Sequence, residues 1–142
     1  GDLWPPSIFV GKGNKIRLID WEFVHYGRPL QDVGHFAAHC WMQGQIENSS
    51  RKTRQWNTLW GSFLSTYKGQ TETLSDELMN EQELNDIGIH IGTEILIRTF
   101  GPFKNGYIYE PYIDKHELLL EAKERALDFI LDADATLREF GF

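Results

Sequence analysis

Four oxygen-bearing side chains near the start of the sequence have types and spacing that could hold a cation and move a proton. They are Asp2, Ser7, Asp20 and Glu22. A carboxylate can accept the proton of a reacting hydroxyl, and carboxylate and hydroxyl oxygens are the ligands that Mg²⁺ prefers. This chemistry requires that the chain bring the four side chains together.

The elements around these residues predict a β-hairpin. Short apolar runs at 7–10 and 16–20 flank a connection at 11–15 that contains two glycines and an asparagine. Glycine and asparagine adopt positive φ easily, so this connection favours a tight turn between two strands. We expect the turn to centre near Gly13.

This hairpin would gather the acidic residues at its base. With the turn near Gly13, Asp20 lies level with Pro6 and beside Ser7, and Asp2 lies in the loop that enters the same end. The prolines after Trp4 stiffen that loop because each fixes φ and restricts its predecessor. Each aspartate also has an ordinary structural explanation. Asp2 could cap a turn, and Asp20 could simply end a strand.

Three ordered stretches resemble the aminoglycoside phosphotransferase and choline kinase superfamily, small-molecule kinases with a protein-kinase-like fold. Residues 1–10, GDLWPPSIFV, resemble the catalytic loop of that superfamily. Residues 19–22, IDWE, resemble its metal-binding aspartate segment at the expected distance. Residues 27–34, GRPLQDVG, resemble the turn that opens its next helix.

The resemblance implies roles for the residues at these positions. Asp2 would be the catalytic base, Asp20 the principal Mg²⁺ ligand, and Ser7 and Glu22 secondary metal ligands, with ATP as co-substrate. Asp32 is either a plain helix cap or, as the resemblance implies, a support that hydrogen-bonds the catalytic loop.

Ser7 stands where the superfamily pattern has asparagine. Methylthioribose kinases, one branch of the superfamily, also carry serine there, and residues 20–27, DWEFVHYG, are similar to the segment that follows in them. The resemblance would let Glu22 compensate for the missing asparagine.

Arg98 falls within the apolar stripe of a predicted helix, so its charge needs a partner. Glu94, one turn earlier, is the ordinary candidate for an intrahelical ion pair. Alternatively, residues 92–101, GTEILIRTFG, resemble a methylthioribose kinase segment whose arginines serve the substrate, with Ile97 in the place of the first arginine. Arg98 and Trp4 are the substrate-contact candidates.

The predicted fold class is α+β and mainly helical, as a single domain over residues 1–142. Apolar residues recur at helical spacing in four later stretches, which predict helices at about 32–44, 56–69, 81–100 and 114–140. The resemblance implies the C-terminal lobe of a kinase-like protein, with the hairpin carrying the catalytic and metal loops. The N-terminal nucleotide-binding lobe would be absent from this sequence, and we expect the fragment to be poorly active alone.

Two histidines and one cysteine lie in the first predicted helix. His35 and His39 are spaced for a metal site but lack a third ligand nearby, so we expect a solvated or surface-packed pair. Cys40 lies in the apolar stripe, where a buried, inert thiol is expected. As the sole cysteine it permits no intramolecular disulfide, which favours a reducing, cytoplasmic setting.

The formal net charge of −7 argues against nucleic acid or an anionic membrane as the main partner. We therefore expect an ATP-dependent phosphotransferase that acts on a hydroxyl of a small metabolite. Its chief competitor is a non-catalytic, kinase-like module that binds a ligand or protein. A metal-dependent hydrolase is a third possibility, without a histidine ligand pattern in its favour.

Overall fold

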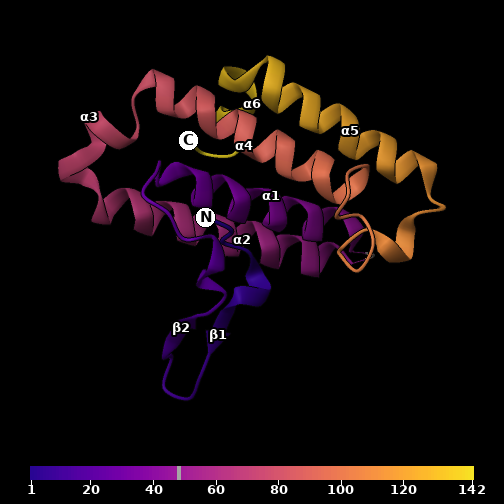
Figure 1. Cartoon of the computed structure of the whole chain (residues 1–142), viewed down its shortest axis with the longest axis horizontal. Helices are drawn as coiled ribbons and strands as arrows, with labels where there is room; N and C mark the ends of the chain where they lie inside the picture. Colours follow the sequence, from indigo (N-terminus) through magenta and orange to yellow (C-terminus); the bar gives the residue numbers. More distant parts are fainter. Residues whose placement is uncertain (48) are drawn as a thin grey trace.

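The computed structural model describes residues 1–47 and 49–142, and all their side chains except that of Ser75. A β-hairpin near the N-terminus leads into a body of packed helices (Figure 1). The expected class, α+β and mainly helical, is confirmed at this level. In the described ranges, no helix combines the length and the apolar character needed to cross a membrane.

The hairpin pairs β1 (Ile8–Val10) with β2 (Ile16–Leu18) in antiparallel register. Ile8 lies opposite Leu18, as a turn centred near Gly13 requires. Gly13 and Asn14 both have positive φ, which confirms the turn chemistry predicted from the sequence. Both strands are shorter than predicted.

The helical elements follow the hairpin in chain order. Short 3₁₀ turns lie at Pro5–Ser7, Trp21–Phe23, Glu72–Leu74 and Glu110–Tyr112. The α-helices are α1 (Leu30–Ile46), α2 (Ser50–Gln70), α3 (Ser75–Leu78), α4 (Glu81–Thr99), α5 (His116–Leu131) and α6 (Ala133–Glu139).

Helix α4 lies at the centre of the body, against α1, α5 and α6, while α2 packs on the other side of α1 (Figure 1). Ile87, Ile91 and Ile95 of α4 are fully buried. Cys40 of α1 is also buried, and burial raises the pKa of its thiol to about 12, which confirms an inert core residue.

Two helix predictions were wrong in detail. Helix α1 begins before Asp32, with Pro29 as its N-cap residue, so Asp32 lies in the first turn and is not the cap. The predicted final helix is divided at Asp132, whose φ of −137° and ψ of 65° interrupt it. After this break α6 packs against α4, and its Leu137 is buried.

The hairpin projects away from the helical body, and its apolar side chains stay exposed (Figure 1). Phe9, Val10 and Ile16 are 56%, 71% and 67% exposed. The core therefore lies in the helices, and the hairpin contacts the body at its base, where the candidate site lies.

Candidate functional site

Asp32 fixes the loop that carries Asp2. Its Oδ2 accepts a hydrogen bond from Gly1 N and its Oδ1 accepts one from Leu3 N, each at 3.0 Å. Because the two bonded nitrogens flank Asp2, the backbone of that residue is held against the start of α1. Asp32 thus makes the contacts of a loop support.

The Asp2 side chain faces two basic groups of the helical body. Its Oδ1 lies 3.6 Å from Arg98 Nη2 on α4 and 3.8 Å from His35 Nδ1 on α1. These distances are longer than hydrogen bonds, so neither group bonds directly to the carboxylate, and Arg98 acts on it through its positive charge. One oxygen of Asp2 therefore lies between α1 and α4.

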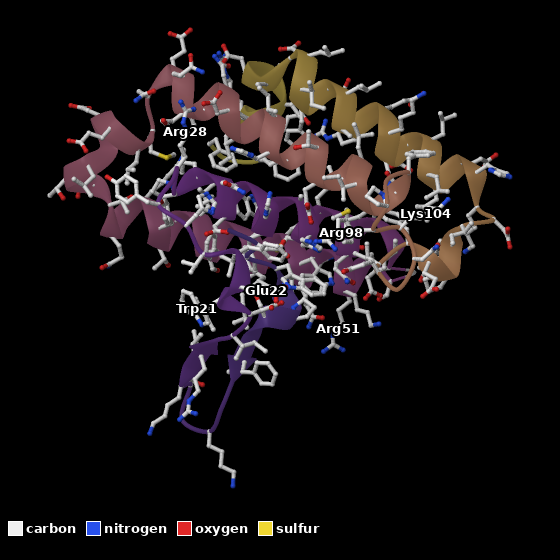
Figure 2. All side chains as sticks on the ribbon, in the orientation of Figure 1. Trp21, Glu22, Arg28, Arg51, Arg98 and Lys104 are labelled. Atoms are coloured by element: carbon white, nitrogen blue, oxygen red, sulfur yellow. The ribbon has the colours of Figure 1, made fainter. Side chains whose placement is uncertain are left out.

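A cavity of about 480 Å³ lies where the hairpin meets the helices, and Asp2, Asp20 and Glu22 all line it. In Figure 2 the labelled Glu22 lies at the base of the hairpin and Arg98 lies on the body nearby, and both line this cavity. Asp20 has a positive φ of 68°, and its side chain forms no capping hydrogen bond with the 3₁₀ turn that follows. Its carboxylate is therefore available to a ligand.

Ser7 lies in a different position from the other candidate metal ligands. Its side chain is buried, its Oγ donates to Trp4 O at 2.8 Å, and the same oxygen accepts from Trp4 N at 3.4 Å. Ser7 lines a smaller cavity of about 130 Å³, together with Asp2 and Asp20 but without Glu22. The structure therefore brings Asp2 and Asp20 into both cavities and leaves Ser7 and Glu22 in separate ones.

The two substrate-contact candidates meet in the larger cavity. The Arg98 guanidinium carbon lies 5.4 Å from the ring centre of Trp4, and it lies closer still, at 4.3 Å, to that of Tyr107. A third ring, that of Phe103, is 5.6 Å away. We call Trp4, Phe103 and Tyr107 the aromatic cage.

Glu94 is the partner of Arg98, as the sequence suggested, but the pair is buried. Glu94 Oε1 accepts from Arg98 Nε at 2.7 Å and from His39 Nε2 at 2.9 Å. Burial alone would raise the pKa of Glu94, but the hydrogen bonds from His39 and Arg98 outweigh it and lower that pKa to about 2. A charged network thus joins α1 to α4 behind the cavity.

The expectation of a solvated or surface-packed histidine pair was wrong. His39 is 3% exposed and bonded to Glu94, because α1 turns this face toward α4. His35 is largely buried beside Asp2 and packs edge to face on His90 of α4. Burial lowers the pKa of His35, against the opposing effect of nearby acids, which favours its neutral form.

Sequence reasoning assigned no role to several residues of this site. Tyr107 and Phe103 lie in the connection between α4 and α5, where only a high aromatic content was visible. His25 also lines the cavity, and its Nδ1 donates to Phe23 O at 3.0 Å. One indication that such residues exist was present in the sequence. Arg98 falls within an apolar stripe, and an arginine in that position needs partners.

Compared with protein-family models, with curated proteins and with solved structures, the chain matches none of them. The kinase-like interpretation therefore stays a prediction based on motifs. Among the residues that the structure describes, no three histidine, cysteine, aspartate or glutamate side chains come together as a metal site.

Proposed function

We propose that this chain is the acceptor-binding and metal-binding lobe of an ATP-dependent phosphotransferase that acts on a hydroxyl of a small molecule. The observation that carries the proposal is that Asp2 and Asp20 line one cavity of about 480 Å³, together with Glu22. Phosphoryl transfer needs a carboxylate at the acceptor hydroxyl and acidic ligands for the metal that accompanies ATP. The order and spacing of the motifs support the same reaction.

Asp2 would act on the acceptor. Its carboxylate orients the acceptor hydroxyl and takes its proton, while the hydroxyl oxygen forms a bond to the γ-phosphorus of ATP and the bond from that phosphorus to the bridging oxygen breaks. The products are the phosphorylated acceptor and ADP. Asp32 keeps Asp2 in place through the nitrogens of Gly1 and Leu3.

Asp20 and Glu22 fit the needs of Mg²⁺ bound together with nucleotide phosphates. Magnesium is commonly held by one or two carboxylates, with phosphate oxygens and waters as the remaining ligands. Both carboxylates line the cavity, and neither forms an ion pair with another described residue. When bound, the ion would neutralise charge on the phosphates, and the residues of this chain would hold it beside Asp2.

The direct test is Asp2→Asn in the full-length protein, together with the nucleotide-binding lobe that this reaction requires. Loss of a catalytic base lowers kcat by about 10²- to 10⁴-fold. Asp134→Asn is the matched control, because Asp134 lies on α6 and is 69% exposed. ATP-dependent phosphorylation that survives Asp2→Asn unchanged would refute the assignment of the base.

One observation favours a second candidate, a non-catalytic module with the same fold. The hydroxyl of Ser7, where the superfamily has its metal-binding asparagine, is bonded to the backbone of Trp4. A module without metal chemistry would tolerate this arrangement. A magnesium-dependent rise in Tm when ATP is added to the full-length protein favours the enzyme, and absence of nucleotide binding favours the module.

A further inference from the structure

The aromatic cage is already filled by a cation of the protein itself. The Arg98 guanidinium carbon lies within 6 Å of all three ring centres, and the residue is only 5% exposed. The cage residues and Arg98 line the same cavity of about 480 Å³. Aromatic rings grouped in this way recognise organic cations such as quaternary ammonium groups.

Glu94 locks Arg98 in this position. The hydrogen bond from Nε to Glu94 Oε1 fixes the guanidinium, and His39 holds the same carboxylate oxygen from α1. Both side chains of the Glu94 and Arg98 pair are nearly inaccessible, so displacing the guanidinium would strand a buried carboxylate. The guanidinium therefore occupies the position between the rings that a ligand ammonium group would take, and its positive charge repels that group.

Arg98 still has donors to offer. A guanidinium carries five N–H donors, and among the described residues its hydrogen bond goes to Glu94 through Nε alone. The nearest other carboxylate oxygen, Asp2 Oδ1, is 3.6 Å from Nη2. Because the Nη groups of Arg98 form no hydrogen bond with the described residues and the residue lines the cavity, this edge favours a ligand with oxygen acceptors.

Three carboxylates besides that of Glu94 also line the cavity. Asp2, Asp20 and Glu22 accept hydrogen bonds from ligand hydroxyls, and they repel an anionic ligand. A hydroxyl group can both accept from Arg98 and donate to a carboxylate, whereas an ammonium group cannot accept and a carboxylate only accepts.

We infer that the cavity selects an uncharged, polyhydroxylated acceptor and that Arg98 excludes ammonium-bearing molecules by occupying the aromatic cage. The identity of the phosphorylated molecule rests on the proposed function. The occupied cage does not, so its effect on binding is measured without ATP.

The first experiment uses choline as the probe and isothermal titration calorimetry as the measurement. Arg98→Ala empties the cage and leaves Glu94 and Asp2 without their cation, so choline should bind this variant at least about tenfold more tightly than wild type. Arg98→Lys keeps a positive charge there and is the matched control, expected to show no such gain. Equal choline affinity in wild type and Arg98→Ala would overturn the inference.

A second measurement decides the question if Arg98→Ala does not fold. The Tyr107 ring signals of the wild-type protein are followed by NMR during a choline titration, with ribose as the uncharged comparison. Choline should leave these signals unchanged. A saturable shift of the Tyr107 ring signals with choline would show that an ammonium group enters the cage, and it would contradict the inference.

The acceptor class is tested with the full-length protein, Mg²⁺ and ATP. Phosphoryl transfer to ribose and related neutral polyols, at a kcat/KM at least about tenfold above that for choline, supports the inference. Preferential transfer to choline refutes it. Transfer to no hydroxyl compound refutes the proposed function and the acceptor class with it, while the calorimetry separately decides whether the cage is closed to ammonium groups.

Discussion

Glu94 Oε1 lies 2.7 Å from Arg98 Nε, in a pair one helical turn apart on α4 whose side chains are only 5% and 6% exposed. Removing one partner of a buried ion pair leaves the other charge without compensation. We therefore expect Glu94→Ala to lower the free energy of unfolding by about 3–5 kcal/mol, measured by urea denaturation. The pair thus stabilises the contact between α1 and α4 as well as the position of Arg98.

The matched control for Glu94→Ala is Asp134→Ala. Asp134 and Arg138 have the same spacing on α6, but their side chains are 69% and 77% exposed. An exposed pair of this kind contributes only about 0.3–0.5 kcal/mol. Equal losses in the two variants would mean that burial does not distinguish the pairs, contrary to the structure.

The lowered pKa of Glu94 should make the free energy of unfolding depend on pH. Its pKa falls from an ordinary value of 4.5 to about 2 in the folded protein, because the hydrogen bonds from His39 and Arg98 outweigh burial. A lowered carboxyl pKa stabilises the fold above the unfolded value, and this contribution disappears as the pH falls from about 4.5 toward about 2.

The measurement compares urea denaturation of wild type and Glu94→Gln across that pH range. Glu94→Gln has no proton to bind at this position, so its stability should fall less steeply with acid than that of wild type. Parallel curves for the two proteins would show that Glu94 titrates normally.

The hydrogen bonds that Asp32 accepts should stabilise the loop around Asp2. Asp32→Ala removes the acceptor for Gly1 N and Leu3 N, which should cost about 1–3 kcal/mol of stability. The specific readout is hydrogen exchange at the Leu3 amide, which should speed up more than exchange at core amides of α4. Unchanged exchange at Leu3 would show that the carboxylate does not hold this loop.

The parts of the fold that were predictable from sequence depend on local chemistry. Gly13 and Asn14 adopt the positive φ that a tight hairpin turn needs, and the period of isoleucines marks α4. The break at Asp132 was not predictable in this way, because the apolar spacing continues through it. The division is visible only in the tertiary structure, where α6 packs against both α4 and α5.

The candidate site was predictable only in part, for a similar reason. The hairpin register placed Asp20 near the loop of Asp2, and both residues line one cavity. Tyr107 reaches Arg98 through the path of the connection after α4, and no sequence period encodes that path. Nor did the sequence show that His39 faces Glu94, since this depends on how α1 is rotated against α4.

Helix α4 packs closely against the end of α5 at Gly88. A Cβ added at Gly88 would lie 2.6 Å from Phe129 O and 2.8 Å from the Cβ of Ala133. One of these neighbours is backbone, so the helices must move apart, and Gly88→Ala should cost about 1–3 kcal/mol although alanine favours helix.

Gly61 in the middle of α2 is the matched control for Gly88, because a Cβ there meets no atom within 4 Å. Gly61→Ala should therefore stabilise the protein by up to about 1 kcal/mol through helix propensity alone. Thermal and urea unfolding of the two variants should give changes of opposite sign. A stabilising Gly88→Ala would mean that α4 and α5 are not packed this closely, and the position of α4 behind the cavity would then be wrong.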